Sequence, residues 1–296
     1  MQTYKIHRKM LGSVNRTFAA GAMLFAALTA ASAEGMDLGI SLRAFGGAAT
    51  QVAPNTAVRN SLYWSDDSEQ ALDAYRNGDF ETALRLWEVE AQAGDLIAQW
   101  HLAMMYRLGQ GVRSDSAQAL HYYEMAATQF DADRSDMNIF AMTRDALFWV
   151  AYYHQNGVEQ AGIQPRPDYA FRIYRVTANH GHAGSQFYIG VMLLNGQGIS
   201  RDSKQGMRWL NLAAEKCYAP AMAQLGEIYW RGELQSQDHA RGLMWYNLAS
   251  ESAQEEANPE IFDRYEELYL TASDEERHLA EGLALQWKER NPLRGE

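Results

Sequence analysis

Apolar and small residues recur along this chain with the spacing of one face of an α-helix, and the pattern itself repeats. Counted from a small residue as position 0, they return at +3, +4, +7 and +8, which places them on one helix face. The position-0 residues are Ala83, Ala119, Ala170, Gly206 and Gly242, at separations of 36, 51, 36 and 36 residues. A fixed period of this size predicts a solenoid of helical repeats.

Each repeat is predicted to be a pair of helices, which we name A and B. Helix A carries the position-0 residue. Aspartates four residues earlier, Asp115, Asp202 and Asp238, are expected to cap the free amides at its start. Gly94 and Gly181 are placed to end helix A with positive φ. Cys217 takes the same place, which favours a small residue at a helix end over a redox role.

Helix B is predicted to carry a tyrosine at one equivalent position and to end in a glycine-containing loop. The tyrosines are Tyr106, Tyr153, Tyr229 and Tyr265, and the loops are Gly109-x-Gly111 and Gly196-x-Gly198. Tyr153 lies 11 residues later than one period predicts, so 11 of the 15 extra residues in the second repeat are expected before helix B and four after it. We expect them to form surface loops near 130–144 and 158–168, where recognition residues often lie; harmless excursions are the alternative.

The chain begins with the features of a cleavable export signal. Lys5, Arg8, Lys9 and Arg16 precede an apolar run from Phe18 to Leu28, and Ala31-Ser32-Ala33 supplies a cleavage site. The run is too short to span a bilayer, which needs roughly 20 residues, so a membrane anchor is disfavoured. We predict cleavage after Ala33, a flexible lead-in over 34–65, repeats over 66–257, and a last B helix and capping helix over 258–296.

The net charge of the chain limits the kinds of partner that it can bind. The full chain has a net charge of −11, and removal of the signal leaves 22 Lys and Arg against 37 Asp and Glu, a net charge of −15. This balance argues against non-specific binding to nucleic acid or to an anionic membrane. No later run approaches the length of a transmembrane helix, so we expect no membrane insertion after cleavage.

We find no pattern that predicts an enzyme, a metal site or a cofactor. The eight histidines lack metal-ligand spacing, and His180-x-His182 falls at a predicted helix end. The Gly-x-Gly loops lack the third glycine and the Walker lysine of phosphate-binding loops, so they are interpreted as turns. No Ser-His-Asp order is recognisable.

A protein-binding surface is therefore the main candidate. Positions +2, +5 and +9 of helix A lie away from the apolar face and should align into a groove when the repeats stack. The candidate residues are Arg85, Glu88, His121, Glu124, Arg172, Arg175, Asn179, Arg208, Asn211 and Asn247, with Met244 also at a +2 position. Arginines cluster in the middle of this set, which suggests an acidic strip on the partner. An ordinary solvated face is the alternative.

The stretch Gly109-Gln110-Gly111-Val112-x-x-Asp115-x-x-x-Ala119-x-x-Tyr122-Tyr123-x-x-Ala126-Ala127 resembles the Sel1-like repeat, a relative of the tetratricopeptide repeat. The same motif returns from Gly196 to Ala214. The fourth repeat departs from it, with Leu234 in place of the second loop glycine. The resemblance implies an all-α, right-handed solenoid of about five helix pairs with a C-terminal capping helix.

A second resemblance concerns function. The export signal, the Gly/Ala-rich lead-in, Ala74-Tyr75-x-x-Gly78, the long insertion and Ala240-Arg241-Gly242-Leu243-Met244 are similar to ExoR-type periplasmic regulators of alphaproteobacteria. This implies a periplasmic, non-catalytic protein that binds the sensor domain of a two-component histidine kinase and restrains exopolysaccharide synthesis and motility. The alternative is a cell-envelope scaffold or adaptor for wall- or glycan-processing assemblies.

Overall fold

The computed structural model describes residues 66–234, 236–253 and 258–292, and the predicted export signal and lead-in lie outside them. Within this part the structure is helical, apart from one bridge between Val158 and Ile163. The helices are α2 (Asp66–Arg76), α3 (Phe80–Gln92), α4 (Leu96–Leu108), α5 (Ser116–Ala127), α6 (Met137–Asn156), η2 (Glu159–Ala161), α7 (Pro167–Asn179), α8 (Ala183–Asn195), α9 (Ser203–Ala214), α10 (Ala219–Arg231), α11 (His239–Ser252), α12 (Pro259–Thr271) and α13 (Asp274–Arg290).

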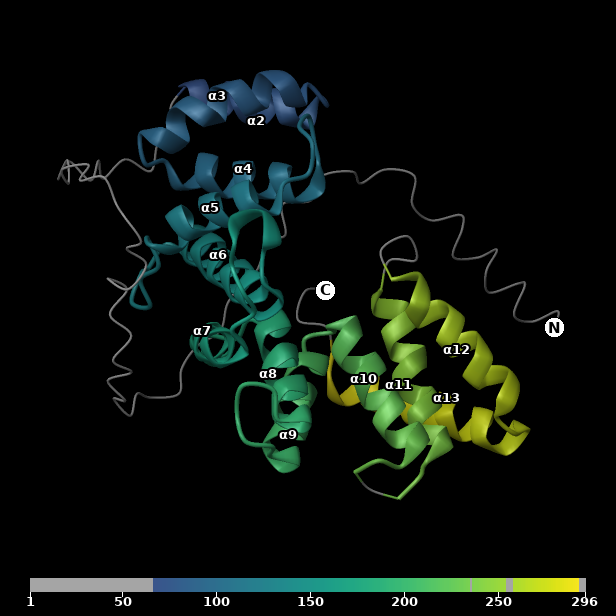
Figure 1. Ribbon diagram of the computed structural model, residues 1–296. Coiled ribbons are helices and arrows are strands. Elements are labelled where there is room, and N and C mark those ends of the chain that lie inside the picture. Colours follow the sequence, from purple (N-terminus) through teal and green to yellow (C-terminus); the bar gives the residue numbers. More distant parts are fainter. Residues whose placement is uncertain (1–65, 235, 254–257, 293–296) are drawn as a thin grey trace.

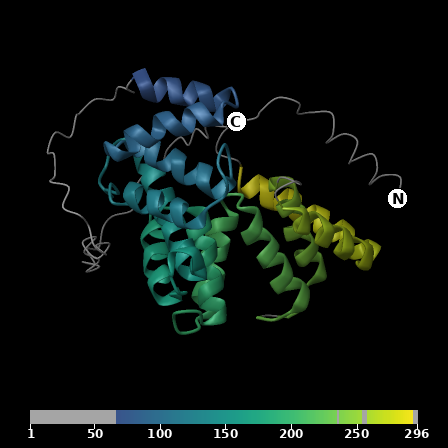
Figure 2. The same ribbon diagram turned by 45° about the horizontal axis from the view of Figure 1, so that its top comes forward.

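The helices stack in chain order, so the predicted all-α solenoid is confirmed. Each packs mainly on its neighbours in the sequence, from α2 on α3 to α11 on α12 and α13. Helices A are α3, α5, α7, α9 and α11, and each is followed by a helix B: α4, α6, α8, α10 and α12. The stack bends, with α7 and α9 on the outer side of the bend and α8 and α10 toward its inner side (Figure 1). A tilted view shows the same progression from the early helices to α13 (Figure 2).

Small residues let each helix B lie against the next helix A. The position-0 alanines and glycines are buried, as the sequence pattern predicted. The approach is closest where two glycines meet. A Cβ on Gly190 of α8 would lie 3.1 Å from the Gly206 carbonyl of α9, and one on Gly226 would lie 3.1 Å from the Gly242 carbonyl. A larger residue at these positions would force the helices apart.

The second glycine of each Gly-x-Gly loop has a tertiary role. A Cβ on Gly111 would lie 2.4 Å from Cβ of Phe80, at the start of α3. A Cβ on Gly198 would lie 2.5 Å from the backbone nitrogen of Asp168, at the start of α7. Each loop therefore packs against the helix A that precedes its own helix B, which explains why the motif recurs with the period.

Side-chain caps begin most of the helices, including the three that were predicted. Asp115 accepts from the amides of Ala117 and Gln118, and Asp202 and Asp238 each accept from the amide three residues later. Gly94 and Gly181 have positive φ, as expected. Cys217 is the one non-glycine residue with positive φ in the described part of the chain, at 57°, which supports its assignment to a helix end.

The insertion in the second repeat differs from the expected surface loop. The stretch 137–143 is helical, because Asp136 caps a helix in which Phe140 and Thr143 are buried. This makes α6 20 residues long, whereas α4, α8, α10 and α12 have 13 each. The apolar spacing after Asp136 was the signal for this extension.

The ends of the B helices also correct the alignment of the repeats. Helices α4, α6, α8 and α10 end at Gly109, Gly157, Gly196 and Gly232. Counting back three residues, the equivalent of Tyr106 is His154 rather than Tyr153, and in α12 it is Tyr269 rather than Tyr265. Twelve of the 15 extra residues therefore precede the end of α6 and three follow it. The second insert is an ordered turn, in which the Val158 and Ile163 backbones exchange hydrogen bonds of 2.8 and 3.0 Å.

The last helix closes the stack as predicted. Ser273 and Glu276 form the expected capping box at the start of α13. Helix α13 packs on α11, where Ala280 and Ala284 are buried and Trp287 meets Trp245 edge-on at 5.7 Å. Helix α11 is thus covered by α10, α12 and α13 together.

Candidate functional site: surfaces for a protein partner

The ten residues predicted to line a groove lie on five A helices. They are Arg85 and Glu88 of α3, His121 and Glu124 of α5, Arg172, Arg175 and Asn179 of α7, Arg208 and Asn211 of α9, and Asn247 of α11. Helices α7 and α9 lie on the outer side of the bend (Figure 1). None of the ten lines the surface hollow beside Glu227 or the one beside Gly157. Their part in binding stays a prediction.

Four of the ten are half-buried: Glu88, Glu124, Asn211 and Asn247. The two acids contact helix B of their own repeat. Glu88 accepts a hydrogen bond of 3.4 Å from the Tyr106 hydroxyl, and Glu124 Oε1 lies 3.6 Å from Nε2 of His154. These carboxylates hold helix A to helix B, so they are less available to a partner than their positions suggested.

The three arginines of α7 and α9 are exposed. Arg172 lies 4.0 Å from Asp168 of its own helix, and its guanidinium carbon is 5.7 Å from the centre of the Tyr169 ring. Arg175 and Arg208 make no ion pair with any described residue. A surface pair such as Arg172–Asp168 contributes at most about 1 kcal/mol, so all three remain able to meet an anion.

Met244 does not belong to this surface. It is 5 % exposed and packs in the core formed by α9 to α13. Helix α11 packs against α10, α12 and α13, and more of its residues are buried than on any other helix A. The predicted row of +2 residues therefore ends at α9.

Helices B carry a second surface that the sequence analysis did not identify. Half-buried apolar and aromatic side chains lie along α4, α6 and α8, and we name them the aromatic helix B face: Trp100, Met104, Trp149, Tyr152 and Tyr188. The Tyr152 ring lies 5.4 Å from that of Trp149 and 6.0 Å from that of Tyr188, so the face is continuous from α6 to α8.

A sequence signal for this face exists once the helix ends are known. Eight residues before the ends of the five B helices stand His101, Trp149, Tyr188, Gln224 and Arg264. Trp149 and Tyr188 of this row belong to the face, whereas His101 stacks on a ring of α3 and the neighbouring Trp100 takes its place; the last two repeats have polar residues here. Counted from Tyr153 instead, the same position in the second repeat would be Phe148, which is buried and does not belong to the face.

Arg107, near the end of α4, is fixed against this face. Its guanidinium carbon lies 4.1 Å from the centre of the Trp149 ring. Its Nε donates a hydrogen bond of 3.2 Å to the hydroxyl of Tyr123, a residue that is fully buried. Arg107 itself is half-buried and forms no ion pair with any described residue.

Asp145 connects the aromatic helix B face to a buried polar chain. It accepts a hydrogen bond of 2.9 Å from the Trp100 indole, and its other oxygen lies 3.8 Å from Nε2 of His182. Nδ1 of His182 accepts the backbone N–H of Ser185, at 3.1 Å, and lies 3.0 Å from its hydroxyl. Asp, His and Ser therefore meet, but Ser185 is fully buried and hydrogen-bonded to Thr177. The group acts as a helix cap and gives no substrate access to the hydroxyl.

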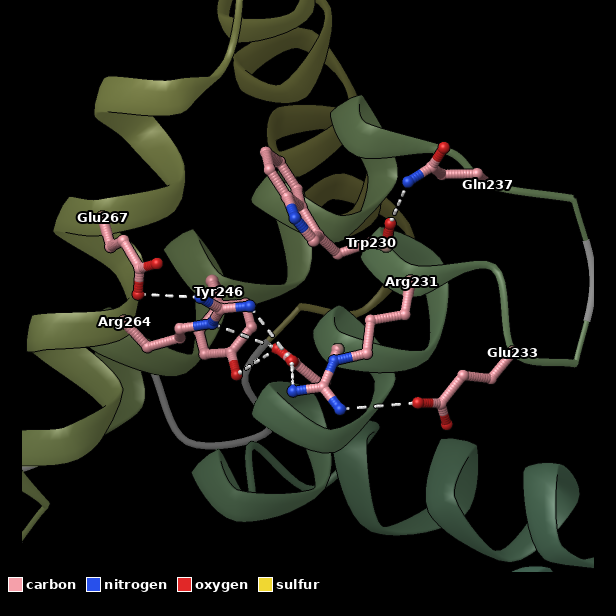
Figure 3. Close-up of polar contacts among 8 residues, drawn as sticks. Trp230, Arg231, Glu233, Gln237, Tyr246, Arg264 and Glu267 are labelled. Atoms are coloured by element: carbon pink, nitrogen blue, oxygen red, sulfur yellow. Dashed lines mark hydrogen bonds and ion pairs between the residues drawn. The ribbon is translucent and has the colours of Figure 1, made fainter.

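The most concentrated charge cluster joins α10, α11 and α12. Arg231 and Arg264 both pair with Glu227, and the Tyr246 hydroxyl donates to it at 3.1 Å. In Figure 3 Arg264 extends from α12 toward Arg231 of α10, with Glu267 on the α12 side. Burial opposes ionisation of Glu227, but the hydrogen bonds and charges of its partners outweigh it, so its pKa lies below the usual value. Burial and the Glu227 charge raise the pKa of Tyr246.

Two shallow hollows lie on the surface. One, of about 230 Å³, lies beside the Glu227 cluster and is lined by Pro220, Ala223, Gln224, Glu227, Tyr246, Glu260 and Ile261. The other, of about 420 Å³, lies under the second insert and is lined by Asn156, Gly157, Glu159, Ile163, Gln164 and Pro165. Neither brings together a nucleophile, a base and an oxyanion donor, which is the arrangement that catalysis of acyl transfer requires.

Over the described residues, no three His, Cys, Asp or Glu side chains are grouped so that they could hold a metal ion. Burial raises the pKa of the Cys217 thiol, which makes the nucleophilic thiolate less populated. None of the helices over the same range combines the length and the apolar character that crossing a bilayer would require.

Four segments of the chain match the Sel1 repeat model: residues 96–129, 144–182, 183–216 and 219–253. Each begins in a helix B and ends in or just after the following helix A. The structure also resembles the Sel1 repeat protein from Oxalobacter formigenes, with a TM-score of 0.53, 22% identity, and coverage of 75% of this chain and 88% of that one. This likeness concerns the fold.

Two curated relatives carry the description exopolysaccharide production negative regulator. The protein from Rhizobium leguminosarum bv. viciae is 30% identical over 152 residues, and that from Rhizobium meliloti (strain 1021) is 29% identical over 153. Each match covers 51% of this chain and 56% of the relative, so it spans just over half of the relatives' length. The matched repeats, and the helix pairs into which they fold, make this chain a Sel1 repeat protein.

Proposed function

We propose that this Sel1 repeat protein is an exported, non-catalytic negative regulator of exopolysaccharide production that acts by binding another protein. The observation that carries the proposal is the similarity to two relatives described as exopolysaccharide production negative regulators. The partner is the periplasmic domain of a two-component sensor histidine kinase, and binding holds that kinase in its inactive state. Export is supported by the basic head, apolar run and Ala31-Ser32-Ala33 of the first 33 residues.

The fold supports binding rather than chemistry. An elongated stack of helices exposes a large surface relative to its volume, and repeat proteins use such surfaces for partners. Among the described residues, polar groups that are close together serve as caps or as ion pairs between helices, as the Asp145 chain and the Glu227 cluster do. Such groups fix the relative positions of the repeats, and a rigid stack loses less conformational freedom on binding.

The exposed arginines of α7 and α9 are the part of the predicted A-helix set that suits a partner. Arg172, Arg175 and Arg208 stand out on a protein that carries 37 acids. We propose that they meet an acidic strip. The double substitution Arg172→Glu with Arg208→Glu should then weaken binding to the sensor domain in a pull-down. Unchanged binding would exclude this surface while leaving the regulatory function open.

The function is tested by deletion and by direct binding. Deleting the gene should raise exopolysaccharide output and change motility, and a copy that encodes residues 1–296 should restore both. The purified protein beginning at Glu34 should bind the purified periplasmic sensor domain. N-terminal sequencing of the periplasmic fraction should begin at Glu34. A deletion strain with normal exopolysaccharide, together with no binding to the sensor domain, would reject the proposal.

A further inference from the structure

Arg107 is held in one position without an ion pair to any described residue. Stacking on Trp149 at 4.1 Å fixes the plane of the guanidinium, and the hydrogen bond from Nε to Tyr123 fixes its rotation. Neither terminal nitrogen makes a hydrogen bond or an ion pair with a described residue. A guanidinium with its fork free is suited to a carboxylate, which it can bind through two parallel hydrogen bonds.

Two other half-buried arginines, Arg264 and Arg277, are paired inside the chain. Arg264 meets Glu227 and Glu267, and Arg277 pairs with Asp274 and donates to the Tyr269 carbonyl. Acids outnumber Lys and Arg by 37 to 26, so an internal acid for Arg107 would be easy to supply. Asp145, whose charge acts on the same Tyr123 hydroxyl as that of Arg107, accepts a hydrogen bond from the Trp100 indole instead. The fixed guanidinium of Arg107, without an ion pair to any described residue, is therefore suited to an anionic group of a binding partner.

The surroundings of Arg107 indicate what kind of molecule carries the anion. Its neighbours on the aromatic helix B face are half-buried Trp, Tyr and Met side chains, which with Arg are the residue types enriched in protein–protein interfaces and their hot spots. We infer that a segment of the partner protein lies along α4, α6 and α8, places an Asp or Glu carboxylate on Arg107, and packs apolar side chains on Trp100, Trp149 and Tyr188. This inference rests on the proposed function and names the chemistry of the segment that is recognised.

The contact between Arg107 and the partner carboxylate should slow dissociation of the complex more than it speeds association. The chain as a whole is acidic, so long-range attraction does not steer an acidic segment toward it. A short-range, partly desolvated ion pair mainly lowers the rate at which a complex separates. The aromatic helix B face and the exposed arginines of α7 and α9 can be mutated separately, because they lie on different helices.

The test uses the protein from Glu34 to Glu296 and the purified periplasmic domain of the sensor histidine kinase in a kinetic binding assay. Arg107→Gln should weaken binding at least about 30-fold, mainly through faster dissociation. Arg107→Lys should also bind less tightly than the wild type, because lysine keeps the charge but loses the planar fork and the stacking. Arg290→Gln removes the same charge from an exposed position on α13, outside both proposed surfaces, and should leave binding unchanged. Circular dichroism melting curves establish that each variant is folded.

The partner carboxylate is found by changing each acidic residue of the sensor domain to its amide. One such change should weaken binding by about the same factor as Arg107→Gln, and combining the two should cost little more than either alone. If the wild type does not bind the sensor domain, the proposed function fails and this inference fails with it. If the wild type binds and folded Arg107→Gln binds equally well, or if no sensor carboxylate is coupled to Arg107, the inference alone is overturned.

Discussion

Nδ1 of His182 accepts the backbone N–H of Ser185 at 3.1 Å, so a histidine caps α8 where aspartates cap the neighbouring helices α4, α5, α6 and α9. An imidazole can accept this hydrogen bond only through an unprotonated nitrogen. The other ring nitrogen faces Asp145 of α6 at 3.8 Å. One side chain thus begins α8 and connects it to the preceding helix B.

Replacing His182 by alanine should destabilise the protein by about 1 kcal/mol, since the amides at the start of α8 lose their side-chain partner. His182→Asn should retain most of the stability, because an amide oxygen can accept the same hydrogen bond and adds no charge beside Asp145. Urea unfolding followed by circular dichroism measures both. Equal losses for the two variants would show that the cap is not what His182 contributes.

The parts of the fold that depend on residues close in sequence could be predicted. The caps at Asp115, Asp202 and Asp238, and the positive φ at Cys217, follow from the repeat pattern because each involves a single helix end. The burial of Met244 could not be predicted in this way. Met244 lies on α11, which also packs against α13, a contact that the repeat period does not contain.

The candidate site was predictable only in part for the same reason. Exposed positions on helix A follow from periodicity, so Arg172 and Arg208 lie on the surface as expected. The fixing of Arg107 on Trp149 joins two repeats and depends on how α4 crosses α6.

Gly198→Ala should destabilise the protein much more than Gly162→Ala. Both glycines have positive φ, 70° and 68°, which costs an alanine about 1 kcal/mol or slightly more. A Cβ at position 198 would in addition overlap the backbone at the start of α7, at 2.5 Å, whereas nothing lies within 4 Å of one at position 162. The overlap should add about 1–3 kcal/mol. Thermal melting of the two variants measures the difference, and similar melting temperatures would contradict the close packing of the loop on α7.

His101 should make the protein less stable as the pH falls. Its ring stacks on that of Trp87 at 4.3 Å, and burial, with a smaller effect from Arg76, lowers its pKa to about 4. The pKa of an unfolded histidine is about 6.5, so the unfolded state takes up the proton first. This contribution to stability is complete above about pH 6.5 and is lost as the pH falls toward 4, by on the order of 3 kcal/mol at most.

The measurement compares the wild type with His101→Phe, which can keep the stacking on Trp87 but does not titrate. The free energy of unfolding from urea titrations between pH 7.5 and about pH 4.5 should fall less steeply in the variant than in the wild type. Because every other titrating group is common to both proteins, the difference between the curves isolates His101. Parallel curves would show that the imidazole titrates at the same pH in the folded and unfolded chains.

Glu227 should contribute more to stability near neutral pH than an exposed acid of the same cluster does. Its side chain is 18% exposed and pairs with Arg231 and Arg264, and its pKa is lowered. A carboxyl whose folded pKa is depressed adds stability above its unfolded pKa, about 4.3, and this stability is lost as the pH falls through the folded pKa. Glu227→Gln should therefore cost about 1–3 kcal/mol at pH 7, where charged hydrogen bonds are lost.

The cost of Glu227→Gln should shrink below about pH 4, because the wild-type carboxyl then takes up a proton and loses the same interactions. Glu233 offers the matched control, since it is 53% exposed and lies 3.5 Å from Arg231. Glu233→Gln should change stability by less than about 0.5 kcal/mol. Hydrogen exchange of the α12 amides resolves the local effect, because the ends of a repeat stack can open independently of its centre. Faster exchange in α12 for Glu227→Gln but not for Glu233→Gln would establish that Glu227 holds α12 to the stack, and equal exchange in both would contradict it.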